Sequence, residues 1–222
     1  HGFRFDTVPS LLTMPYVIKD LFEECGENID EYIKIKRLDI ICKYFYSDNT
    51  IINAYSDPAK FGKEIEENTI DTYETLKSYL NYCKTIYELT GDLFLTKDPS
   101  SVSTYLNSKA LKTLLNIKKI DPFRTMNEAN ESFFKDQRLV QLFNRYATYN
   151  GSNPYLAPAT LNIISHVEYN QGSFIPEDGI FSITKALLKL AEKKGVSVFL
   201  NQKINEIVVE NNEAKAIKVP DN

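Results

Sequence analysis

Apolar and polar positions repeat with different periods along the chain. From Pro9 to Cys25 the apolar residues recur at three- and four-residue steps, which predicts an amphipathic helix. From Tyr32 the period changes to two, and a turn signal at 47–49 separates apolar runs at 40–46 and 50–55. We therefore predict an antiparallel three-stranded meander after the first helix.

The central block is predicted to be helical. Helix starts are predicted where aspartate precedes a proline or a helix-forming run, at Asp57, Asp121 and Asp136. A long helix is expected from about Asp71, with an interruption at Gly91. The block therefore reads as a layer of helices that follows the strands.

The last third has a different pattern. A turn at 176–179 leads into a helix that ends at Gly195. The run 196–200 is typical of a buried strand, and 204–209 with 214–219 predict a hairpin. This order of helix, glycine, strand and hairpin indicates a return into an α/β nucleotide-binding domain.

Composition narrows the class of protein. The 222 residues include 26 basic and 30 acidic ones, with a net charge of −4 and no dense basic run, so nucleic-acid binding is disfavoured. Three widely spaced cysteines and two histidines give neither a metal site nor a Ser-His-Asp triad. The 14 Tyr and 13 Phe could line a long apolar cavity or form ordinary core.

Three stretches carry a resemblance to a known family. They are GFRFDTVPS at 2–10, RYATYNGSNPYLAPATL at 145–161 and FIPEDGI at 174–180. Together they resemble the phytoene desaturase (carotenoid dehydrogenase) family of FAD-dependent oxidoreductases. The resemblance implies an enzyme that removes hydrogens from a long polyene such as phytoene, by hydride transfer to flavin and loss of a proton from the neighbouring carbon.

The same resemblance implies a domain plan. The expected fold is α+β, a mixed or antiparallel sheet covered by helices, whose chain ends add strands to an incomplete α/β FAD-binding domain. Residues 1–10 are expected at the edge of that domain, 11–175 in a substrate-binding domain, and 176–222 back in the FAD domain. The chain reads as an internal fragment without the N-terminal flavin fingerprint, so alone it is expected to be inactive and to retain no FAD.

The resemblance also suggests cofactor-binding residues, namely Asp6, Val8, Gly179 and Ile204. The family usually carries glycine where Val8 stands, and a β-branched residue resists positive φ. Asp6 could instead cap the following helix, Gly179 could serve only a turn, and Ile204 could be an ordinary strand residue.

The candidate walls of a substrate tunnel are all aromatic: Phe5, Tyr146, Tyr149, Tyr155 and Phe174. Each of them could equally be ordinary core. No catalytic residue is assigned. Glu168 and His166 are considered as proton acceptors, against a surface carboxylate and a structural histidine, and Arg145 as an anion contact, against a solvated helix-face arginine.

The expected partners follow from the substrate. A polyene dissolves in bilayers, so we expect a cytoplasmic enzyme with peripheral membrane contact, for which the segment 102–117 is a weak candidate. The oligomeric state is left open. Two other functions stay open: a non-catalytic module that binds apolar ligands or a partner, and an amine-oxidase-like flavoenzyme on the same scaffold.

Overall fold

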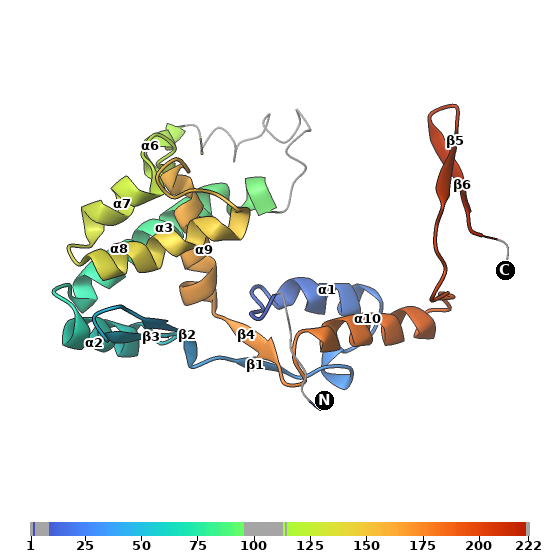
Figure 1. Ribbon diagram of the computed structural model, residues 1–222, viewed down its shortest axis with the longest axis horizontal. Helices are drawn as coiled ribbons and strands as arrows, with labels where there is room; N and C mark the ends of the chain where they lie inside the picture. The colour runs from blue at the N-terminus through green and yellow to red at the C-terminus, as the bar shows by residue number, and fades with distance from the viewer. Residues whose placement is uncertain (1, 3–8, 96–112, 114, 221–222) are drawn as a thin grey trace.

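The structure is a computed structural model that describes residues 2, 9–95, 113 and 115–220. The chain forms an α+β fold with three visible parts: a helical body, a narrow β ribbon flanked by two helices, and a hairpin arm (Figure 1). The expected α+β class is confirmed. The predicted domain division near residues 10 and 175 stays a prediction.

The elements are as follows. The α-helices are α1 (Tyr16–Glu24), α2 (Pro58–Asn68), α3 (Tyr73–Leu95), α6 (Ile117–Ile120), α7 (Met126–Phe133), α8 (Gln137–Asn144), α9 (Ile163–Ser165) and α10 (Phe181–Lys193). The strands are β1 (Ile35–Arg37), β2 (Ile40–Phe45), β3 (Ile51–Tyr55), β4 (Phe174–Pro176), β5 (Glu206–Glu210) and β6 (Glu213–Lys218). The 3₁₀ helices are η1 (Ile29–Glu31), η2 (Arg145–Asn150) and η3 (Ala159–Asn162), and η4 (His166–Gln171) is a π-helix.

In the described part of the chain, the strands form three separate two-stranded antiparallel sheets and not one sheet covered by helices. The predicted hairpin of β2 and β3 is confirmed. The predicted three-stranded meander is wrong, because β1 pairs with β4, with Ile35 opposite Pro176 and Arg37 opposite Phe174. A two-residue period identifies a strand but not its partner, and here the partner lies far along the chain.

The body is held together by an aromatic core. Tyr79 of α3 lies 4.4 Å, centroid to centroid, from Phe143 of α8, and Phe143 stacks on Phe134 at 4.8 Å. All three rings are buried, and the β2–β3 hairpin covers this core with Ile52 and Ala54. Burial of these large apolar rings is the main favourable contribution to folding of the body.

Capping side chains set several helix starts. Asp57 accepts a hydrogen bond from the backbone N–H of Lys60, and Asp136 accepts one from Arg138, so both predicted caps are confirmed. The predicted helix start at Asp121 is wrong. Helix α7 begins later, with a capping box between Thr125 and Glu128, which satisfies two free N–H groups at once.

One other sequence prediction is corrected in this part of the body. Gly91 does not interrupt α3, which continues to Leu95. The glycine is buried, and a Cβ placed on it would lie at an ordinary contact distance, 3.4 Å, from the Tyr87 ring. Asp121 holds Arg124 and accepts from the Tyr82 hydroxyl instead of opening a helix.

A second, smaller core lies between α1 and α10, on the other side of the β1–β4 ribbon (Figure 1). Phe22 of α1 packs with Ala186 and Leu190 of α10. Glu27, just after α1, accepts hydrogen bonds from Lys193 of α10 at 2.6 Å and from Tyr32 at 2.9 Å. The first and last thirds of the chain therefore meet here.

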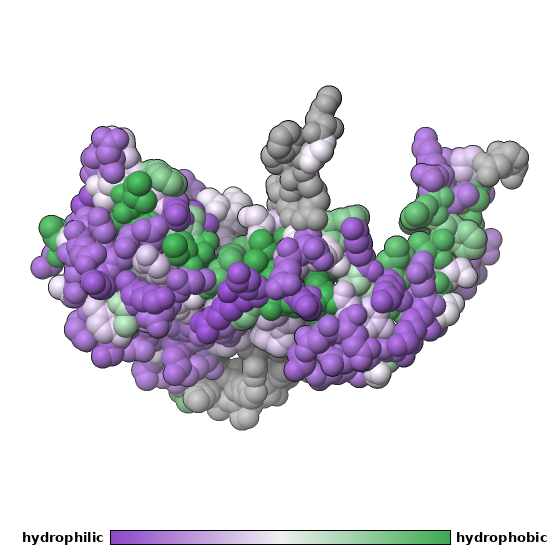
Figure 2. All heavy atoms as spheres, turned by 90° about the horizontal axis from the view of Figure 1, so that it is seen from below, coloured by the Kyte–Doolittle hydropathy of each residue, from purple (hydrophilic) through white to green (hydrophobic). Residues whose placement is uncertain are grey.

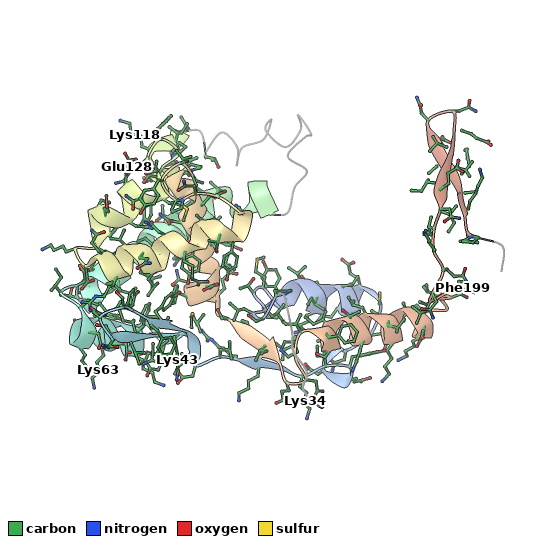
Figure 3. All side chains as sticks on the ribbon, in the orientation of Figure 1. Lys34, Lys43, Lys63, Lys118, Glu128 and Phe199 are labelled. Carbon is green, nitrogen blue, oxygen red and sulfur yellow. The ribbon has the colours of Figure 1, made fainter. Side chains whose placement is uncertain are left out.

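The arm after α10 leaves its apolar residues uncovered. The predicted buried strand at 196–200 is wrong, because these residues are not in a strand, are exposed, and pair with no other strand in the described part of the chain. Phe199, labelled at the base of the arm in Figure 3, is 79% exposed. The predicted hairpin is confirmed as β5 and β6, and Figure 2 shows apolar side chains along it.

Candidate functional site

One carboxylate of the helical body, that of Glu168, is buried among side chains that donate hydrogen bonds to it. Glu168 is fully buried, although the sequence suggested a surface carboxylate as the default. It lies in the π-helix η4, a rare conformation that recurs at functional sites. The chain leaves this turn at Gly172 with φ +107°, where a Cβ would approach the Arg37 guanidinium to 3.0 Å. Only glycine suits that exit.

Both carboxylate oxygens of Glu168 accept hydrogen bonds from tyrosines of η2. The Tyr146 hydroxyl donates to Oε2 at 2.6 Å, and the Tyr149 hydroxyl donates to Oε1. Two of the predicted tunnel residues therefore meet on one acid, with ring centroids 5.9 Å apart. Tyr146 is fully buried, whereas Tyr149 is 47% exposed.

Arg145 supplies the positive charge of this cluster. Its Nη2 lies 3.6 Å from Glu168 Oε2, and its Nε donates to the Tyr44 hydroxyl at 2.9 Å. The guanidinium also lies over the Tyr146 ring, 4.6 Å from the centroid. With 35% of its side chain exposed, Arg145 is a partly buried, ordered arginine and not the freely solvated one considered first.

The electrostatics of Glu168 follow from these contacts. Burial raises the pKa of its carboxyl, while the Tyr146 hydrogen bond and the Arg145 charge act in the opposite direction. Both oxygens accept from hydroxyl donors, which is the pattern of an ionised carboxylate. We assign an ion pair between Glu168 and Arg145. Because both oxygens are occupied, Glu168 is poorly placed to accept a proton from a substrate.

A groove of about 500 Å³ runs beside this cluster, within the volume range of small-molecule sites. Arg145 and Thr148 form part of its wall, together with Tyr155, a third predicted tunnel residue. Carboxamides of α8 line another part, from Gln137, Gln141 and Asn144. Tyr155 is 63% exposed and lies apart from the Glu168 cluster, as one wall of this groove.

His166 has the contacts of a structural residue. Its Nδ1 lies 2.7 Å from the Asn170 amide nitrogen, and its ring lies 4.5 Å from the Tyr87 ring. Burial lowers the pKa of the imidazole, and the nearby Lys84 charge adds to this effect. The His166 side chain is therefore buried and is held by its contacts with Asn170 and with the Tyr87 ring.

The remaining predicted site residues are dispersed. Phe174 lies in β4, where its backbone exchanges two hydrogen bonds with Leu12. Gly179 occupies the turn before α10 at φ +81°, with its N–H bonded to the Pro176 carbonyl. Ile204 lies at the other end of α10, exposed before β5. Phe5, Asp6 and Val8 lie outside the described residues.

These positions do not build a flavin site by themselves. A dinucleotide needs backbone N–H groups of a glycine-rich turn around its phosphates, and this sequence has no Gly-x-Gly-x-x-Gly run. Gly179 lies before α10, whose 13 residues span roughly 20 Å at 1.5 Å per residue, and Ile204 lies a further 11 positions after the end of that helix. We therefore describe no chemical step through FAD on these residues.

The described residues include neither a metal-binding group nor a membrane-spanning helix. Among them, no group of three or more His, Cys, Asp or Glu side chains could hold a metal ion. None of the helices in the same part of the chain combines the length and apolar character that crossing a membrane requires.

Sequence reasoning missed the cluster as a unit. It singled out Tyr146 and Tyr149 for their place in the second stretch, but gave no role to Tyr44, which lies about 100 residues earlier. Glu168 was expected to be a surface residue, because a single glutamate among polar neighbours is usually exposed to solvent. The available signal was the density of tyrosines around one Arg and one Glu in 145–169.

Comparisons with known proteins give relatives of one kind. The chain is 36% identical over 218 residues to a 1-hydroxycarotenoid 3,4-desaturase from a Flavobacterium species, covering 97% of this chain and 44% of that protein. It is 29% identical to a 4,4'-diapolycopene oxygenase from Methylomonas, and 31% identical to a 4,4'-diaponeurosporene oxygenase from Staphylococcus aureus. The chain spans less than half the length of these curated relatives.

Other comparisons add little. No family model matches the chain. A solved structure of Rab GDI from Plasmodium falciparum aligns with 95% of this chain and with 46% of the Rab GDI chain. The TM-score is 0.47 and the sequence identity is 14%. The sequence matches extend along nearly the whole chain. Along nearly its whole length the chain is similar to carotenoid desaturases and oxygenases, and these relatives fit the carotenoid dehydrogenase family.

Proposed function

We propose that this chain is the substrate-binding part of an FAD-dependent oxidoreductase that removes hydrogens from a long apolar polyene. The observation that carries the proposal is the match to the 1-hydroxycarotenoid 3,4-desaturase, which covers 97% of the chain and so includes the segment 145–168. This segment holds the Glu168 cluster and one side of the groove.

In the whole protein, bound FAD would supply the acceptor for the hydrogens removed from the polyene. The part proposed for this chain is to bind and orient the polyene and to exclude water. Aromatic side chains such as Tyr149 and Tyr155 offer flat, polarisable faces for conjugated double bonds. Glu168 is not proposed as the proton acceptor, because both of its oxygens are engaged.

The rest of the proposal concerns the whole protein. In a protein as long as the relatives, the exposed apolar residues of the arm would pack against the cofactor domain, since large exposed apolar patches mark interaction surfaces. We also propose a cytoplasmic location with peripheral membrane contact, because the substrate dissolves in bilayers.

The test is expression of the full-length gene in cells that accumulate phytoene or its hydroxylated derivatives. We expect further-desaturated pigments in the extract and FAD in the purified protein. Bound FAD with untouched polyenes would favour the amine-oxidase-like alternative. A bound polyene without flavin or hydrogen loss would favour the non-catalytic module.

A further inference from the structure

The most exposed large apolar side chains in the described part of the helical body lie at one end of it, around α6. Phe123 is 81% exposed, Leu156 is 80% exposed and Leu115 is 77% exposed. Single exposed apolar residues are normal on a protein surface, whereas several together mark a surface that contacts another molecule. The candidate membrane segment 102–117 lies mostly outside the described residues, and Leu115 belongs to its described end.

Phe123 and Leu156 lie in two segments that are distant in the sequence and are hydrogen-bonded to each other. The Ala159 N–H donates to the Arg124 carbonyl at 2.8 Å, and the Thr160 hydroxyl donates to the last carbonyl of α6 at 2.6 Å. Both exposed side chains therefore project from a fixed backbone, so little conformational entropy is lost when another surface covers them.

The charges of these two segments are mainly basic. Residues 115–127 and 145–167 contain four basic side chains and one acidic side chain, although the whole chain has a net charge of −4. The acidic residue, Asp121, is buried and pairs with Arg124 at 2.6 Å. This end of the body therefore carries an excess of positive charge.

Lys118 and Lys119 of α6 supply the exposed part of that charge. Both side chains are exposed, and in the described part of the chain neither of them forms an ion pair. Figure 3 labels Lys118 at this end of the body, near Glu128. The Glu128 carboxylate accepts hydrogen bonds from the N–H and hydroxyl groups of Thr125, so its lone pairs are already engaged.

An anionic bilayer surface fits this combination of side chains. Apolar side chains enter the boundary between headgroups and acyl chains, while lysines beside them attract anionic lipids. Tyr155, which is 63% exposed, adds a ring of the kind enriched at this boundary, and it also forms part of the groove beside α8. A symmetric contact with a second copy would instead bring Lys118 and Lys119 close to the same lysines, which repel each other.

We propose that the whole protein docks on an anionic bilayer through one surface, which we call the α6 patch: Leu115, Lys118, Lys119, Phe123, Tyr155 and Leu156. The inference rests on the proposed function, because it assigns the peripheral membrane contact proposed there to a particular surface. The apolar side chains of the patch enter the lipid, and its two lysines bind the phosphate groups of the lipid headgroups.

The experiment is co-sedimentation of the full-length protein with two kinds of vesicle, phosphatidylcholine with phosphatidylglycerol and phosphatidylcholine alone. Phe123→Ser combined with Leu156→Ser should weaken binding to the mixed vesicles by about tenfold or more, because two large apolar side chains no longer enter the lipid. Phe45→Ser is the matched control. Phe45 is 72% exposed but lies in β2, outside the patch, so this change should leave binding unaltered.

A second pair of variants tests the charge. Lys118→Gln combined with Lys119→Gln should remove the preference for vesicles that contain phosphatidylglycerol. The same change at Lys43 and Lys63, which lie in β2 and α2 and are labelled in Figure 3, should keep that preference. All the substituted side chains are exposed, and near-ultraviolet circular dichroism checks that each variant is folded.

Unchanged binding in the double serine variant of the α6 patch, or an equal loss in Phe45→Ser, would overturn the inference. Loss of an oligomer in the double serine variant without a change in vesicle binding would also overturn it, and would identify a second copy as the partner. A protein that desaturates polyenes but binds neither kind of vesicle would overturn the inference and leave the proposed function standing. Binding through the patch by a protein that leaves polyenes untouched would support the inference and count against the proposed function.

Discussion

The helical body and the C-terminal arm both carry regularly spaced apolar residues, but these residues lie in opposite environments. In the body, Tyr79 and Phe143 are fully buried among other aromatic rings. In the arm, Phe199 and Ile207 are 79% and 61% exposed. A strand-like or hairpin pattern in the sequence predicts which residues are apolar enough to favour burial. Whether they are buried depends on the presence of a partner surface. Two phenylalanines, one from each region, make this difference measurable.

The largest expected effect comes from Phe143. Phe143→Ala should lower the free energy of unfolding by about 3–5 kcal/mol, because it opens a cavity between Tyr79, Phe134 and Tyr146. Equilibrium denaturation followed by circular dichroism measures this loss. A loss below about 1 kcal/mol would mean that the body is loosely packed and no different from the arm.

A smaller effect is expected for a buried acid of the body. Asp71 accepts hydrogen bonds from the backbone N–H groups of Lys135 and Asp136, just before α8. Asp71→Ala should lower the free energy of unfolding by about 1–3 kcal/mol, since it leaves these donors without their acceptor. Asp20→Ala, at an exposed position of α1, is the control and should be close to neutral.

The contact between α1 and α10 gives a pH-dependent effect. Hydrogen bonds from Lys193 and Tyr32 lower the pKa of Glu27 to about 2. Because the folded-state pKa lies below the unfolded one, the carboxylate stabilises the protein above about pH 4.3 and loses this effect as the pH falls toward 2. The melting temperature of Glu27→Gln should therefore lie below that of the wild type at pH 7 and meet it near pH 2. A constant difference across this range would contradict the assigned pair.

The smallest effect is expected in the arm. Phe199→Ala in this 222-residue chain should change the free energy of unfolding by less than about 0.5 kcal/mol, because the ring is already exposed. The same substitution in a full-length protein should cost more if the arm packs against another domain there. If the substitution has an equal, negligible effect on the free energy of unfolding in both proteins, the arm does not pack against another domain.

Local signals were predictable from the sequence, and distant pairings were not. Asp57 and Asp136 were identifiable as caps because each aspartate and the helix whose N–H group donates to it are adjacent in the chain. Gly91 was misread as a helix break, because its burial beside Tyr87 outweighs its low helix propensity.

The candidate site shows the same limit. Tyr146 and Tyr149 were found through the resemblance of their segment to a family. The contact that joins them is made by Glu168, which lies in a π-helical turn that no simple period predicts. The cluster also includes Tyr44 of β2, whose hydroxyl accepts a hydrogen bond from Arg145. Side chains that meet only through the fold leave little trace in a single sequence.

The pairing of β1 with β4 has a consequence for how the chain folds during synthesis. Ile35 lies opposite Pro176, so 141 residues separate the two partners. At roughly 5–20 residues per second, β1 leaves the ribosome about 7–30 s before its partner is made. The β2–β3 hairpin, α2 and α3 are contiguous and can assemble in that interval. The strand β1 and the helix α1 that precede them must wait, so these two elements are exposed to chaperones for longer than β2, β3, α2 and α3.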